Sequence, residues 1–130
     1  MIKKTIEESR RYVQNAKDIL GAKAEKEDFR YNDSKYVKLA GHALWTGCLI
    51  ALDYALQIKK RTRKSIDDYR IAAGKRDKKL LKSINDGYNI MHLYMGNDGA
   101  NPVSISSTGI QIAESIISWC ENNTDKKEIN

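Results

Sequence analysis

Apolar residues recur every three or four positions along most of the chain, the spacing that places them on one face of an α-helix. The pattern predicts helices over residues 5–25 and 33–58, a short helix at 65–74, and further helices at 77–95 and from 104 onward. The middle of the second predicted helix is apolar almost all round, which is typical of a helix packed among others. We therefore expect that helix at the centre of the molecule.

Polar side chains suited to helix N-termini stand where the predicted helices begin. They are Thr5 with Glu8, Asp33 or Ser34, Ser65 with Asp68, and Asp77. Gly96 stands where a helix commonly stops. Residues 27–33 form a polar linker, and no pair of strands is expected. The predicted fold class is all-α, an antiparallel bundle of four long helices and one short helix.

Two apolar patterns predict how these helices pack. A ridge of small residues on the second helix should let another helix approach closely; it comprises Ala43, Gly47, Ala51 and Ala55. A core stripe is expected on the fourth helix and comprises Leu81, Ile84, Tyr88, Met91 and Met95. One domain over residues 1–122, followed by a polar C-terminal tail at 123–130, accounts for the whole pattern.

Composition narrows the class of protein. A chain of 130 residues with one proline and eight glycines has little turn chemistry for a sandwich of many short strands. The longest uncharged stretch of helical character, residues 39–52, has 14 residues, whereas a membrane span needs about 20. The start of the chain is charged and has no apolar leader. We expect a cytoplasmic protein with no membrane partner, in which Cys48 and Cys120 are free buried thiols.

The positive charge is concentrated in one region. Residues 59–82 contain 11 Lys or Arg and 3 Asp, whereas the whole chain has a net charge of +6. Such a region attracts phosphates, and its composition predicts salt-dependent binding of nucleic acid. The alternative interpretation is a solvated surface without a binding role, which has the same composition. The candidate anion-binding residues are Lys59, Lys60, Arg61, Arg63, Lys64, Lys75, Arg76, Lys78, Lys79 and Lys82.

Polar residues also interrupt two apolar helices at helical spacing. The candidate polar site comprises His42, Thr46 and Asp53 on the second helix, and Asn85, Asn89 and His92 on the fourth. A carboxylate near two imidazoles suits acid–base chemistry or metal binding. A buried hydrogen-bonded network that fixes helix register has the same pattern. Because no His-x-x-x-His spacing is present, we expect no metal site and no cofactor.

Four sequence blocks carry a resemblance to known proteins. They are residues 41–47 (GHALWTG), 67–70 (DDYR), 75–81 (KRDKKLL) and 92–99 (HLYMGNDG). The chain resembles a small uncharacterised family of bacterial all-helical proteins, a domain of unknown function. That resemblance implies a helical fold and no particular activity.

The order of the helices is more distantly similar to HEPN bundles (higher eukaryotes and prokaryotes nucleotide-binding). Nucleases of that group carry an Arg, four to six residues and then a His. The corresponding positions before His92 are Asn85, Asp86 and Gly87, and those before His42 are Lys35, Tyr36 and Val37. The arginine is missing in both places, so nuclease activity is not expected.

These observations favour a protein that acts by self-association, as a homodimer, or by binding a protein partner. The alternative is a HEPN-like accessory protein that binds RNA, DNA or a nucleotidyl partner through residues 59–82. Catalysis by His42, Asp53 and His92 is the least favoured hypothesis, because no nucleophile motif or phosphate-binding loop accompanies them.

Overall fold

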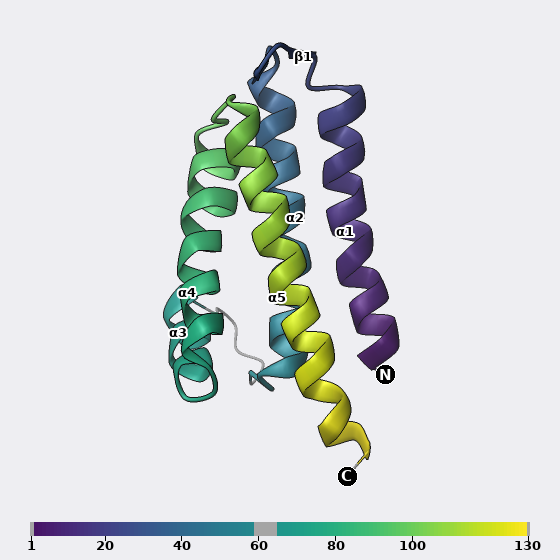
Figure 1. Cartoon of the computed structure of the whole chain (residues 1–130), viewed down its shortest axis with the longest axis vertical. Helices are drawn as coiled ribbons and strands as arrows, with labels where there is room; N and C mark the ends of the chain where they lie inside the picture. Colours follow the sequence, from purple (N-terminus) through teal and green to yellow (C-terminus); the bar gives the residue numbers. More distant parts are fainter. Residues whose placement is uncertain (1, 59–64, 130) are drawn as a thin grey trace.

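The computed structural model describes residues 2–58 and 65–129, and most of them are helical (Figure 1). The elements in chain order are α1 (Ile2–Ala22), β1 (Lys26–Glu27), β2 (Arg30–Tyr31), α2 (Ser34–Ala55), α3 (Ile66–Gly74), α4 (Lys78–Gly87), the π-helix η1 (Tyr88–Asn97) and α5 (Val103–Ile129). The all-α class is confirmed.

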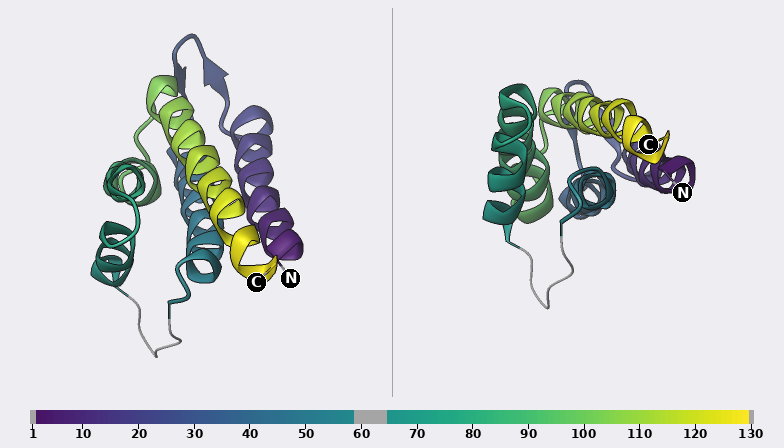
Figure 2. Two further views of the ribbon diagram at one scale, coloured as in Figure 1. Left: turned by 60° about the horizontal axis from the view of Figure 1, so that its bottom comes forward. Right: turned by 90° about the horizontal axis from the view of Figure 1, so that it is seen from below.

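Helix α2 is the central element, as its apolar character predicts. It packs against α1, α5 and η1. In Figure 1, α1 lies to the right of α2 and α5, and α3 and α4 lie to the left. The two further views in Figure 2 show the same grouping, with α3 beside α4 and away from α1.

The largest fully buried side chains come from the central helix, from the α4–η1 segment and from α5. They are Val37, Leu44, Leu52, Ile84, Met91, Met95, Ile116 and Ile117. On α4, Leu80 is only 2% exposed, whereas Leu81 is partly buried at the edge of the core. The predicted stripe is therefore right for Ile84, Met91 and Met95, but the first core leucine is Leu80.

Three helix starts follow the predicted capping chemistry. In the capping box of α3, the backbone N of Ser65 donates to the Asp68 carboxylate at 2.9 Å. The Asp33 carboxylate accepts a hydrogen bond from the backbone N of Lys35, and the Asp77 carboxylate accepts one from that of Lys79. Thr5 does not begin a helix, because α1 already starts at Ile2. At the other end of the chain α5 continues to Ile129, so its final turns contain the polar residues expected as a tail.

The segment expected to be a polar linker forms a β-hairpin. Strands β1 and β2 pair antiparallel, with Lys26 opposite Tyr31 and Glu27 opposite Arg30. The expectation of no strand pair was wrong, because long-range backbone contacts stabilise this short ladder. The backbone N of Tyr31 donates to the Asn101 carbonyl at 3.0 Å, and that of Val103 donates to the Phe29 carbonyl at 2.8 Å.

Glycines mark the closest helix contacts. A Cβ atom on Gly47 would lie 2.8 Å from the Ser9 carbonyl oxygen of α1, so the small-residue ridge is an approach surface at this point. A Cβ atom on Gly41 would lie 2.6 Å from the backbone N of Gly96. Gly96 is therefore a contact residue inside η1, not a helix stop. The positive φ that favours glycine falls later, at Gly99.

Candidate functional site

The two predicted polar stripes come together at His42 of α2 and His92 of η1. The centroids of their imidazole rings lie 6.4 Å apart in an edge-to-face arrangement. Trp45 and Tyr88 complete a group of four rings, which we call the histidine cluster. His92 lies 5.1 Å from Tyr88 and 6.3 Å from Trp45, and the Trp45 and Tyr88 rings lie 6.0 Å apart, centroid to centroid.

Close packing of α2 against η1 positions these rings. Gly41 and Gly96 let the two backbones meet, and the edge of the His42 ring lies 3.2 Å from the position of a Cβ on Gly96. Gly87 makes room in the same way for the Met91 side chain and the Trp45 indole. Helix η1 carries both Tyr88 and His92, and π-helical segments occur often at functional sites.

The hydrogen bonding of His92 is incomplete. Its Nδ1 atom is enclosed and has no hydrogen-bond partner among the described residues. Its Nε2 atom also makes no hydrogen bond to the described residues, but this atom is not enclosed and so reaches solvent. His42 is exposed on the adjacent helix.

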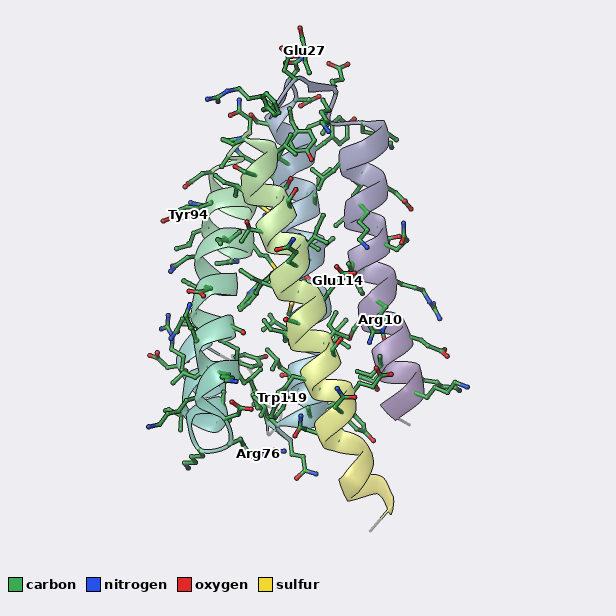
Figure 3. All side chains as sticks on the ribbon, in the orientation of Figure 1. Arg10, Glu27, Arg76, Tyr94, Glu114 and Trp119 are labelled. Carbon is green, nitrogen blue, oxygen red and sulfur yellow. The ribbon has the colours of Figure 1, made fainter. Side chains whose placement is uncertain are left out.

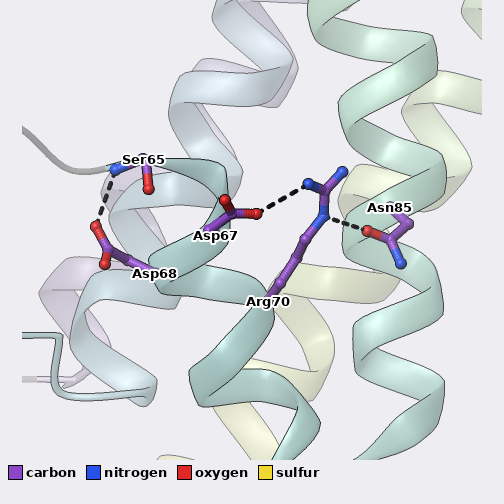
Figure 4. Close-up of polar contacts among 5 residues, drawn as sticks. All are labelled: Ser65, Asp67, Asp68, Arg70 and Asn85. Atoms are coloured by element: carbon purple, nitrogen blue, oxygen red, sulfur yellow. Dashed lines mark hydrogen bonds and ion pairs between the residues drawn. The ribbon is translucent and has the colours of Figure 1, made fainter.

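The other members of the predicted polar site have different surroundings. Arg70 of α3 donates from Nε to the Asn85 Oδ1 atom at 2.6 Å and forms an ion pair with Asp67 at 3.2 Å (Figure 4). The same guanidinium lies 5.5 Å from the centroid of the Tyr88 ring. Arg70 thus connects α3 to Asn85 and to the Tyr88 ring of the histidine cluster. The sequence analysis did not include Arg70 in the polar site, because it considered only polar residues at helical spacing on the second and fourth helices.

Asp53 serves a structural contact away from the imidazoles. Its Oδ1 atom accepts a hydrogen bond of 2.7 Å from the Tyr69 hydroxyl, so α2 and α3 are joined here. Burial, followed by this hydrogen bond, raises the pKa of Tyr69 above its usual range. Thr46 and Asn89 are exposed on α2 and η1. The structure therefore brings the two histidines together and places Asp53 with a different partner.

These positions limit the chemistry of the histidine cluster. Within residues 2–58 and 65–129, no three His, Cys, Asp or Glu side chains are grouped as a metal ion would require. Neither imidazole makes an ion pair with a carboxylate in that part of the chain. The groups available to a ligand in the cluster are the imidazole nitrogens of the two histidines, which lie beside aromatic rings.

The basic region is described only in part. Lys59, Lys60, Arg61, Arg63 and Lys64 lie outside the described residues. Lys82 forms an ion pair with Asp86 at 2.6 Å. The side chains of Lys75, Lys78 and Lys79 are exposed around the turn between α3 and α4 and have no ion pair within the described part. We call these three residues the basic turn.

Arg76 belongs to a packed contact beside that turn. Its guanidinium lies 5.3 Å from the Trp119 ring centroid, near the lower end of the bundle in Figure 3. It also donates to the Ala55 carbonyl at 3.3 Å. The Trp119 indole donates to the Asp77 Oδ2 atom at 2.9 Å. This hydrogen bond, with that from the Lys79 backbone, lowers the pKa of Asp77. Arg76 is therefore less available to a ligand than the three lysines.

The β-hairpin presents a further surface feature. Phe29 is 85% exposed, although it lies in a segment fixed at both sides. Tyr31 beside it is buried, and its hydroxyl lies 3.0 Å from the Ser106 Oγ atom. Asp28 has a φ of 55°, a backbone conformation that costs energy for a residue with a side chain. The two aromatic residues of an otherwise polar linker, Phe29 and Tyr31, were the sequence signal of this feature.

Comparison with known proteins identifies relatives without a known activity. A solved structure of a protein of unknown function from Dyadobacter fermentans is 40% identical and has a TM-score of 0.87. The match covers 94% of this chain and 97% of that one. A search among curated proteins finds no significant match.

In the described part of the chain, no helix is both long and apolar enough to cross a bilayer.

The model of a family described as a domain of unknown function, DUF5618, matches residues 4–122, nearly the whole chain. The chain belongs to the DUF5618 family.

Proposed function

We propose that this protein acts by non-catalytic association, and that its β-hairpin end binds a second copy of the chain. The observation that carries the proposal is Phe29, which is 85% exposed at the tip of a hairpin held in place by hydrogen bonds. Aromatic side chains on rigid elements are typical anchors of protein interfaces. A fixed hairpin also loses little conformational entropy on binding.

Other exposed apolar residues also favour an interface at the hairpin end of the molecule. Leu39 and Tyr94 are each 48% exposed. Leu39 lies in the second turn of α2, just below the hairpin, and the Tyr94 carbonyl accepts a hydrogen bond from Ala100 in the adjoining loop. Among the described residues, three of the four exposed large hydrophobic side chains therefore lie toward one end. Such residues suit the apolar centre of a two-fold interface, and two-fold dimers are the commonest assembly.

Sedimentation equilibrium tests this proposal directly. At micromolar concentration the protein should have twice the 14.8 kDa mass of one chain. Phe29→Asp should shift the dimer toward monomer, because loss of an aromatic anchor weakens association by about 2 kcal/mol or more, roughly 30-fold in Kd. The matched control is Ile71→Asp, which changes the exposed apolar residue of α3 and should leave the dimer intact. A monomeric wild-type protein at these concentrations contradicts the proposal.

A second candidate function is binding of RNA or DNA through the basic region. The observation that favours it is the basic turn, whose three exposed lysines have no ion pair in the described residues. Lysines without an ion pair neutralise phosphates without first breaking one. This activity and self-association involve different ends of the molecule, so separate variants distinguish them.

We also assign the protein to a reducing cytosol. Cys48 and Cys120 are buried and free, and burial raises the pKa of both thiols, that of Cys120 to about 12. Neutral, enclosed thiols of this kind are inert packing groups. Thiol titration supports the assignment if both cysteines of freshly purified protein react only after unfolding. A disulfide in that protein would contradict it.

A further inference from the structure

We propose that the histidine cluster binds a small oxyanion, the carboxylate or phosphate group of a ligand, between His42 and His92. The two imidazoles come from different helices, and their ring centroids lie 6.4 Å apart. This inference is independent of self-association, because the imidazoles lie on α2 and η1 and not on the hairpin.

The enclosed Nδ1 atom of His92 determines what this side chain offers. A proton on Nδ1 would be a buried donor with no acceptor, and such orphaned donors are rarer in proteins than unpaired acceptors. The neutral ring therefore carries its proton on Nε2, the atom that reaches solvent. His92 thus presents an N–H donor at the surface, without a protein acceptor to compete for it.

His42 supplies a second group beside that donor. It is exposed, and the Nδ1–Cε1 edge of its ring is held against Gly96. Charge-assisted hydrogen bonds to an oxyanion are roughly twice as strong as neutral ones. The hydroxyl of Thr46 lies one helical turn from His42 and adds a further donor on the same face.

The carboxylates around the cluster have other partners, so they do not complete a cation site with the imidazoles. Asp53 is eleven residues from His42, about 16 Å along the helix, and accepts the Tyr69 hydroxyl. Asp86 is paired with Lys82, and Asp98 accepts a hydrogen bond from Asn97 at 3.3 Å. On the side of α3, Arg70 lies over the Tyr88 ring, and its ion pair with Asp67 offsets its charge. Two imidazoles without a third ligand fall short of the three or more protein ligands typical of zinc sites.

The site is also preorganised. Gly41, Gly87 and Gly96 leave no space for larger side chains at the α2–η1 contact, so the helices have one close arrangement. Trp45, only 7% exposed, forms the buried wall against which His92 packs. A ligand that enters such a site does not have to order the groups that hold it.

NMR titration with inorganic phosphate and with acetate tests the proposal, at constant ionic strength, at pH 6 and in the presence of EDTA. The imidazole resonances of both histidines should shift together. His42→Ala and His92→Phe should each raise Kd about tenfold or more, the usual effect of removing a hydrogen bond to a charged group. Binding by phosphate alone identifies a phosphate ligand, and binding by acetate alone a carboxylate; each result supports an oxyanion site.

Control variants separate this site from other positive charges and from association. Lys79→Ala removes a lysine of the basic turn and should change Kd less than twofold, and Phe29→Asp should bind the anion as the wild type does. The proposal is overturned if neither anion shifts the imidazole resonances at concentrations up to about 50 mM, well above the millimolar Kd of a weak ligand. It is also overturned if Lys79→Ala weakens binding as much as the histidine variants do, or if stoichiometric zinc, added without EDTA, binds the two rings.

Discussion

At the scale of single residues, glycines decide where the histidine cluster forms. Gly41 and Gly21 both lie in helices, but their surroundings are opposite. A Cβ on Gly41 would lie 2.6 Å from Met95 Cβ and from the backbone N of Gly96, whereas nothing lies within 4 Å of a Cβ on Gly21. The general cost of glycine in a helix is the same at both positions, about 0.5–1 kcal/mol relative to alanine.

Substitution by alanine should therefore have opposite effects at the two positions. Gly41→Ala should lower the free energy of unfolding by about 1–3 kcal/mol, because backbone atoms of η1 cannot move aside cheaply. Gly21→Ala should raise it by about 0.4–1 kcal/mol, because it only restricts the unfolded chain. Urea denaturation of both variants measures the difference. Equal effects would show that α2 and η1 do not touch at Gly41.

Residue types revealed part of the site but not its contacts. The spacing of His42 and His92 predicted that each would lie on a polar face, and the structure brings them together. The same reasoning included Asp53, which instead accepts the Tyr69 hydroxyl from α3. A pattern within one helix shows which residues share a face. Which partner reaches that face depends on how the helices cross, and no local signal carries that information.

At the scale of elements, the segment from α4 to η1 shows where helical periodicity is sufficient and where it is not. Helical periodicity predicted a single helix that ends at residue 95, and it predicted most of the residues that this segment buries. The hydrogen-bonding change from α4 to the π-helix at Tyr88 was not predicted, because the four-residue spacing of Met91 and Met95 fits an α-helix as well as a π-helix. Close tertiary contacts lie at both ends of this π-helix, at Gly87 against Trp45 and at Gly96 against His42.

Two adjacent leucines on α4 test the register. Leu80 is 2% exposed and Leu81 is partly buried at the edge of the core. Leu80→Ala should destabilise the protein by about 2–5 kcal/mol, the range for truncation of a fully buried leucine, and Leu81→Ala by less. Thermal or urea unfolding of the pair measures this difference directly. A larger effect at Leu81 would restore the register expected from the sequence and contradict the structure.

The hairpin was missed for a different physical reason. Two strands of two residues each, containing mostly charged side chains, have no alternation of apolar and polar positions to detect. Their stability comes from backbone hydrogen bonds to residues some 70 positions later, at Asn101 and Val103. Helix starts were easier to predict, because a cap such as Asp77 acts on neighbours two and three residues away.

At the scale of the whole molecule, charge and exposed apolar surface are separated. The basic turn lies between α3 and α4, and Phe29 lies on the hairpin at the opposite end of the bundle (Figure 1). The chain as a whole has a net charge of +6. A moderate net charge keeps a protein in solution and strengthens attraction to polyanions in general. The location of the unpaired lysines, however, makes a more specific prediction than net charge does.

If the protein binds RNA or DNA, the basic turn should supply electrostatic contacts. Changing Lys75, Lys78 and Lys79 to Gln should weaken binding of all sequences alike and reduce the slope of log K against log salt concentration by about 0.7–0.9 for each phosphate that is no longer neutralised. Fluorescence anisotropy at several salt concentrations measures both quantities. Changing Lys3, Lys4 and Arg11 to Gln is the matched control, because it removes three exposed basic residues of α1 outside the basic region. Equal weakening by the control would mean that net charge, and not the basic turn, determines binding. A wild-type protein that binds no nucleic acid even at low salt would show that the lysines are only a solvated surface.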